Sequence, residues 1–147
     1  MYLDTSVVIP LYYPEALSQV VELQVEGETF LGISRLVEVE FHSALARRVR
    51  MGELAEHVAI AIANRFQMDV DAERYTRFAL QPVHYDLACN SLKRFNTPLR
   101  TLDALHLAIA RADGLQLITA DDALATSAQI LDVKCQLLKP SQISEEG

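Results

Sequence analysis

Short apolar segments alternate with longer amphipathic segments along the chain, and this alternation limits the possible folds more than any other feature of the sequence. The short segments are typical of β-strands and lie at residues 2–3, 29–33, 77–83, 115–119 and 133–138. The longer segments have the apolar period of helices and lie at residues 15–25, 34–50, 53–68, 84–95, 101–112 and 122–130. This order favours an α/β fold with a mostly parallel central sheet of five strands flanked by helices.

Half of the 147 residues are hydrophobic, which is enough for one well-buried core. We therefore expect a single domain over residues 1–140 and a polar tail over residues 141–147. Helix boundaries are expected at the N-caps Ser34 and Thr101 and at the stop residues Gly52 and Gly114.

Nothing in the sequence indicates a membrane or export segment. No apolar run approaches the roughly 20 residues that span a bilayer, and the first residues lack the pattern of a signal peptide. Cys89 and Cys135 fit no metal-binding spacing, and we expect both to be buried structural thiols. These features predict a cytoplasmic protein without membrane contacts.

The chain is acidic as a whole but carries a local cluster of basic residues. A net charge of −7 is the opposite of what a protein that coats nucleic acid requires. Basic residues are nevertheless bunched at Arg47, Arg48 and Arg50, with Arg35 upstream. They form either a positive strip beside an acidic pocket or a solvated helix face, and these residues alone favour the solvated face.

Acidic residues fall where an α/β sheet presents its ligands. Asp4 ends the first strand, Asp121 follows the fourth, and Asp103 lies in the first turn of a helix whose amino end meets the same edge of the sheet. The carboxyl edge of parallel strands is where open α/β folds place their sites. Asp121 is followed by Asp122, and one acid of this pair is expected to begin the next helix.

A fourth acid comes from the segment 34–50, which contains both Glu38 and Glu40. Two positions on a helix are about 200° apart, so only one of them can face a given pocket. Glu40 lies on an apolar stripe, where an isolated carboxylate is unfavourable. We therefore expect Glu40 in the site, with a salt bridge to Arg47 or another base as the alternative, and Glu38 in solvent.

Four carboxylates in one pocket repel one another strongly. At about 5 Å and an effective dielectric of about 20, each pair costs about 3 kcal/mol. A divalent cation relieves this repulsion at neutral pH, and an all-oxygen set favours Mg²⁺ or Mn²⁺ over zinc. Such a site is suited to metal-dependent hydrolysis of phosphate esters.

Four segments together resemble the PIN domain, in particular the VapC-type ribonuclease toxins of bacterial toxin–antitoxin pairs. They are YLDTS at 2–6, ISRLVEVE at 33–40, TLDALHLAIA at 101–110 and LITAD at 117–121. The resemblance covers nearly the whole chain. It implies a PIN-like three-layer fold, a Mg²⁺- or Mn²⁺-dependent endoribonuclease acting on RNA, a homodimer, and a cognate antitoxin with a basic segment that blocks the groove.

The resemblance also implies roles for individual residues. Asp4, Glu40, Asp103 and Asp121 match the acidic metal-binding and catalytic set, which leaves Asp122 as a helix-starting acid. Supporting positions are Ser6, Thr119 and His106. We expect His106, one turn beyond Asp103, to make a polar contact that orients Asp103.

Two alternatives from other classes are considered. A phosphorylation-receiver domain also has five strands with acids at their ends, but the predicted third strand ends at Val83 and is followed by His84, where a receiver needs an Asp. A non-catalytic PIN-like module that only binds nucleic acid or protein is the second, and the presence of all four acids weighs against it.

Overall fold

Five short strands form one all-parallel sheet in the computed structural model, which describes residues 1–140. The predicted polar tail, 141–147, lies outside the described residues. The sheet order is β3-β2-β1-β4-β5, so the first strand lies at the centre. The strands are β1 (Tyr2–Leu3), β2 (Gly32–Ser34), β3 (Thr76–Phe78), β4 (Leu117–Thr119) and β5 (Cys135–Leu137).

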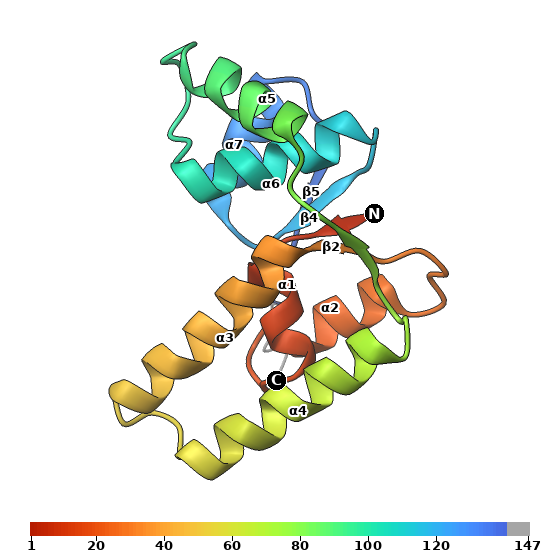
Figure 1. Ribbon diagram of the computed structural model, residues 1–147, viewed down its shortest axis with the longest axis vertical. Coiled ribbons are helices and arrows are strands. Elements are labelled where there is room, and N and C mark those ends of the chain that lie inside the picture. The colour runs from red at the N-terminus through yellow and green to blue at the C-terminus, as the bar shows by residue number, and fades with distance from the viewer. Residues whose placement is uncertain (141–147) are drawn as a thin grey trace, which may run out of the picture.

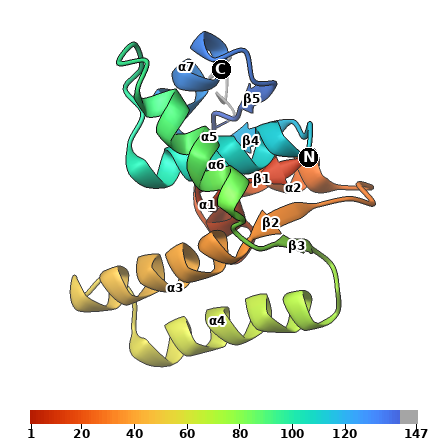
Figure 2. The same ribbon diagram turned by 45° about the horizontal axis from the view of Figure 1, so that its top comes forward.

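Helices cover both faces of this sheet and make a three-layer structure (Figure 1). One layer contains α1 (Thr5–Val8), the 3₁₀ turn η1 (Ile9–Leu11), α2 (Ser18–Val25), α3 (Arg35–Arg50) and α4 (Glu56–Asp71). The other contains α5 (Pro82–Leu92), α6 (Thr101–Ala112) and α7 (Asp122–Ile130). Figure 2 shows the layers from a second direction, with α3 and α4 extending as a long helical hairpin. The predicted α/β class and sheet of five strands are thus confirmed.

The layering follows from the direction in which the chain moves across the sheet. From β1 the chain steps to β2 and β3, then crosses back to β4 and β5 on the other side. Right-handed crossovers place the connecting helices on opposite faces for the two directions. The carboxyl ends of β1 and β4 therefore lie at the topological switch point, where open α/β sheets leave a crevice between their helix layers.

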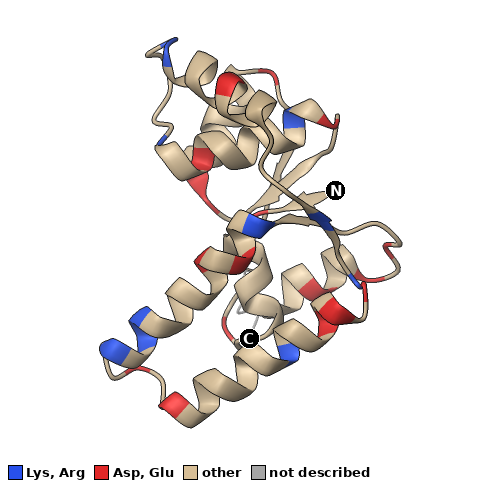
Figure 3. Cartoon of the chain, viewed as in Figure 1, with Lys and Arg blue, Asp and Glu red and all other residues tan. Residues whose placement is uncertain are grey.

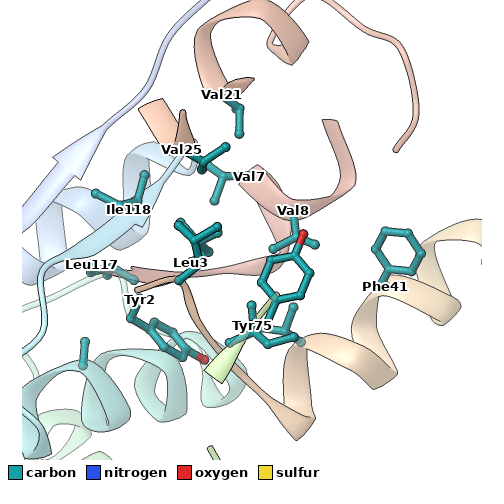
Figure 4. Close-up of a cluster of buried hydrophobic side chains, with 14 of the residues drawn as sticks. Tyr2, Leu3, Val7, Val8, Val21, Val25, Phe41, Tyr75, Leu117 and Ile118 are labelled. Carbon is teal, nitrogen blue, oxygen red and sulfur yellow. The ribbon is translucent and has the colours of Figure 1, made fainter. Parts of the chain in front are cut away.

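The core is built on the two central strands, which are buried on both faces. Tyr2 and Leu3 are fully buried, and Figure 4 shows their side chains on opposite sides of β1, as the twofold period of a strand requires. Leu117 and Ile118 of β4 are also fully buried. This two-sided burial explains why the strands have continuous apolar sequences.

Several predicted boundaries are confirmed and others are wrong. The Ser34 hydroxyl caps α3 by accepting the Val37 amide at 3.3 Å. Gly52 and Gly114 have positive φ angles of 72° and 63°, which fits their predicted role as stops. Thr101 is not a cap, because Arg100 holds that position without a side-chain hydrogen bond.

The third strand is shorter than predicted, and one segment was missed. The predicted strand 77–83 is only Thr76–Phe78, because Pro82 begins α5 and fits the first turn of a helix. The short α1 and η1 directly after Asp4 have too few residues for a periodic pattern.

Two further predictions concern the burial of the cysteines and the presence of membrane-spanning helices. The prediction of two buried thiols is wrong: Cys89 is exposed on the outer side of α5, and Cys135 is partly buried on the edge strand β5. Within residues 1–140, no helix is both long and apolar enough to span a membrane.

Candidate active site

Asp4 lies directly after β1 in a small polar cradle. The residue is only 4% exposed. The Ser6 hydroxyl donates to Oδ1 at 2.6 Å, and the Thr119 hydroxyl donates to Oδ2 at 2.7 Å. Ser6 Oγ also accepts the Ala120 amide at 2.9 Å, which ties the loop after β1 to the loop after β4. The buried carboxylate is thus oriented by one hydroxyl from each side of the switch point.

Asp121 begins α7 and is itself the N-cap of that helix. Its Oδ1 accepts the Leu124 amide at 3.0 Å, and its own amide donates to Thr119 Oγ1 at 3.0 Å. Asp122 lies in the first turn, as predicted, with an exposed side chain whose Oδ2 lies 2.6 Å from Lys139 Nζ. The capping role therefore belongs to Asp121, and its second oxygen, Oδ2, is not used by the cap.

Glu40 lies on the side of α3 that faces α1 and α6. Its Oε1 accepts the Thr5 hydroxyl at 2.9 Å and lies 2.5 Å from His106 Nε2. The side chain is about one quarter exposed. The expected alternative was a salt bridge to Arg47 or another base, and the structure shows its second form, because Glu40 pairs with His106 from the opposite helix layer and not with Arg47.

Glu38 points away from Glu40, as the helix geometry predicts, but the prediction that it is solvated is wrong. Arg77 of β3 donates two hydrogen bonds to the Glu38 carboxylate, from Nε at 3.1 Å and from Nη2 at 2.6 Å. Arg35 Nε lies 3.3 Å from the same group, and the Glu38 side chain is only 13% exposed. Glu38 thus links α3 to the edge strand.

His106 is buried, but its partner differs from the prediction. Its Nδ1 lies 2.7 Å from the Tyr2 hydroxyl, which donates to Ser34 Oγ at 2.8 Å. Its Nε2 faces Glu40. The ring is held between β1 and α3, and it therefore orients Glu40 instead of Asp103. Sequence reasoning missed Tyr2, whose hydroxyl is the only polar side-chain atom of β1.

Burial and neighbouring charges shift the pKa values of three of the acids. Burial raises the pKa of Asp103, and the charges of Asp121 and Glu40 raise it further. Burial also raises the pKa of Asp4, against the hydrogen bonds from Ser6 and Thr119, and Asp121 adds to the increase. For Glu40, burial acts upward, but the hydrogen bond and charge of His106 leave the pKa below its ordinary value. These carboxylates interact electrostatically across the switch point.

The four acids provide oxygen atoms of the type that a hard divalent cation requires. All four acids offer oxygen, the ligand type of Mg²⁺ and Mn²⁺, and each oxygen of Asp4 accepts only one hydroxyl. However, no three His, Cys, Asp or Glu side chains of residues 1–140 form a group that could hold a metal ion. The residue types therefore fit a hard divalent cation, while Glu40 is turned towards His106.

The chain is thus an α/β domain with acidic residues at the switch point of its parallel sheet. The family model of the PIN domain matches residues 1–129. The chain therefore belongs to the PIN domain family. The receiver alternative is wrong, because receiver-type folds have the strand order 2-1-3-4-5, whereas the order here is β3-β2-β1-β4-β5.

Solved structures with the same fold include a bacterial toxin and complexes named FitAcB and VapBC. VapC20 of Mycobacterium tuberculosis, described as a sarcin-ricin loop cleaving toxin, has a TM-score of 0.67 and 18% identity over 86% of this chain and 93% of that one. FitAcB of Neisseria gonorrhoeae has a TM-score of 0.69 and 20% identity over 95% and 96%. DNA-bound VapBC of Salmonella typhimurium has a TM-score of 0.64 and 18% identity over 92% and 95%. Comparison with curated protein sequences gives no match.

Proposed function

We propose that this protein is a metal-dependent endoribonuclease and the toxin of a type II toxin–antitoxin pair. The observation that carries the proposal is the gathering of Asp4, Asp103 and Asp121 at the switch point, where the charge of Asp121 adds to the effect of burial in raising the pKa values of Asp4 and Asp103. Membership of the PIN family supports a nuclease. The likeness to a toxin described as cleaving the sarcin-ricin loop supports RNA as the substrate.

Asp4, Glu40, Asp103 and Asp121 would hold Mg²⁺ or Mn²⁺. Once bound, the ion would supply a hydroxide equivalent at neutral pH and offset charge on the phosphoryl oxygens. Ser6 and Thr119 fix both oxygens of Asp4, so that this carboxylate does not need to reorient. His106, itself held by Tyr2, keeps the Glu40 carboxylate at the edge of the site.

The enzymatic part of the proposal is tested by incubating the protein with total RNA in Mg²⁺, Mn²⁺ or EDTA and mapping the cut ends. We expect discrete cleavage sites with either ion and none in EDTA. Equal cleavage with and without EDTA would contradict the metal requirement, and absence of cleavage with both ions would contradict the nuclease.

The proposed partner is an antitoxin with a basic segment, and the proposed setting is the cytoplasm. Structural neighbours include complexes of VapB with VapC and a toxin–antitoxin complex from Klebsiella pneumoniae. The acidic edge is complementary to arginine, whose planar fork binds carboxylates in a bidentate manner. If charge reversal of every arginine in the co-expressed antitoxin leaves inhibition intact, this mode of inhibition is wrong.

The expected homodimer is checked by light scattering of the toxin alone.

The alternative is a non-catalytic PIN-like binding module, in which the acids at the switch point would hold no ion. RNA binding that persists without cleavage in every metal tested would select this alternative.

A further inference from the structure

A surface groove leads away from the candidate site along α3. It has a volume of about 510 Å³ and begins at Thr5 and Glu40. Glu40, Ala44, Arg47 and Met51 line it at intervals of four, three and four residues, so they share one face of the helix. The groove therefore connects the acidic site with the basic end of α3.

The walls of the groove suit an extended chain. Ser43 and Ala44 are small, so the middle of the groove stays open, and Ser43 adds an exposed hydroxyl. Leu102 of α6 forms part of the lining and is 45% exposed, so it offers apolar surface to a base. Glu53 also lines the groove, beyond the end of α3, and its charge disfavours phosphate there. The favourable position for an anion is thus beside Arg47.

The three arginines at this end of α3 have different surroundings. Arg48 also lines the groove, but its guanidinium lies 4.3 Å from the centre of the Tyr13 ring and 3.6 Å from Glu15, so its charge is already partnered. Arg50 is exposed and does not line the groove. Arg47 is exposed, lines the groove and makes no ion pair within residues 1–140. Figure 3 shows this basic end of α3 in blue and the acidic residues nearer the sheet in red.

We propose that this groove holds the backbone of single-stranded RNA next to the cleaved bond, with Arg47 binding a flanking phosphate. The inference rests on the proposed ribonuclease function and deepens it. Arg47 lies seven residues beyond Glu40, which is about 10 Å along the helix axis. A phosphate there is outside the catalytic site but belongs to the same strand. The guanidinium fork can contact two phosphate oxygens, so Arg47 positions the substrate without touching the reacting atoms.

The test compares Arg47→Ala with Arg50→Ala, which removes the same charge from the same end of α3. Binding of a fluorescent single-stranded RNA is measured by anisotropy in EDTA at several salt concentrations. We expect Arg47→Ala to weaken binding roughly three- to tenfold and to lower the salt slope by about 0.7, the value for one phosphate contact on a single strand. Arg50→Ala is expected to stay near wild type. Arg47→Lys should restore the salt slope but not the full affinity, because lysine lacks the fork.

Kinetics with Mn²⁺ separate this inference from the proposed function. We expect Arg47→Ala to raise KM by a similar factor, with a smaller change in kcat. If the wild type cleaves RNA and Arg47→Ala matches Arg50→Ala in binding and KM, the groove assignment is wrong and the ribonuclease stands. If the wild type neither binds nor cleaves RNA, both fail. If Arg47→Ala weakens an acidic peptide of matched charge as much as it weakens RNA, the groove is a protein-docking surface, which overturns the RNA assignment.

Discussion

Asp4 combines burial with two hydroxyl donors, and this combination defines its chemistry. A buried carboxylate is disfavoured in its charged form, and hydrogen bonds from Ser6 and Thr119 recover only part of that loss. The result is a raised pKa and an anion that a cation would stabilise. An apolar residue here would leave both hydroxyls without their acceptor, whereas asparagine preserves the shape and removes the charge.

The Asp4→Asn variant should therefore become more stable than wild type as the pH rises. The pKa of Asp4 is raised from 3.8, so its contribution to stability is fully present below that value and is lost as pH rises through the folded-state pKa. Asparagine has no such loss. Urea unfolding in EDTA from pH 4 to pH 7 should show a growing advantage for Asp4→Asn, with cleavage abolished. A difference between the two proteins that does not change with pH would contradict the assigned environment.

The adjacent pair Asp121 and Asp122 can be separated by their roles at α7. Asp121→Ala should lose cleavage and also about 1 kcal/mol of stability, because the cap to the Leu124 amide is lost. Asp121→Asn keeps a capping oxygen, so it should lose cleavage while retaining most of that stability. Asp122→Ala should cost at most about 0.5 kcal/mol, because its ion pair with Lys139 is exposed.

Chemical denaturation and RNA cleavage are measured on the same three preparations. A folded but inactive Asp122→Ala protein, together with an active Asp121→Ala protein, would reverse the assignment.

Sequence reasoning locates acids better than it locates their partners. The sequence predicts Asp4 and Asp121 at the carboxyl edge of the sheet, because strand ends are readable from local pattern. The contact between His106 and Glu40 joins residues 66 positions apart, on helices in opposite layers, and no local period encodes it. Glu38 was expected in solvent because the partner that covers it, Arg77, belongs to a strand whose neighbour in the sheet was unknown.

At the scale of elements, α3 both presents a candidate metal ligand and anchors itself to its neighbours, and it uses different faces for these contacts. One face carries Glu40 towards α1 and α6, and another carries Glu38 towards β3. A third contact, the stacked rings of Phe41 and Phe66 at 4.2 Å, joins α3 to α4. The helix is thus fixed by packing and by an ion pair while it presents the candidate ligand, and the hydrophobic period predicts only the packing.

The two glutamates of α3 should give opposite phenotypes. Glu40→Gln is expected to lose cleavage by a large factor with little change in fold, because glutamine can still accept the Thr5 hydroxyl. Glu38→Gln is expected to retain cleavage and to lose about 0.5–1 kcal/mol, since the charged fork with Arg77 is broken at a partly exposed site. Thermal unfolding and cleavage rates measured together check both. An inactive, fully stable Glu38→Gln protein would contradict this division.

At the scale of the whole molecule, strand order determines where chemistry is possible. The chain leaves β1 in one direction and β4 in the other, which opens a crevice at the one edge where Asp4 and Asp121 meet. The alternation of strands and helices predicts a parallel sheet, and the resemblance of four segments predicts its family. The order of strands is not contained in either pattern, because it depends on long-range pairing such as Tyr2 with Leu117.

The central claim is that the acids at this crevice share a divalent cation. Calorimetric titration of the wild type with Mn²⁺ should give saturable binding, and Asp103→Asn and Asp121→Asn should each weaken it at least tenfold. The exposed Asp122→Asn serves as the matched control and should bind like the wild type. Mn²⁺ affinity that is unchanged in both Asp103→Asn and Asp121→Asn would contradict the account.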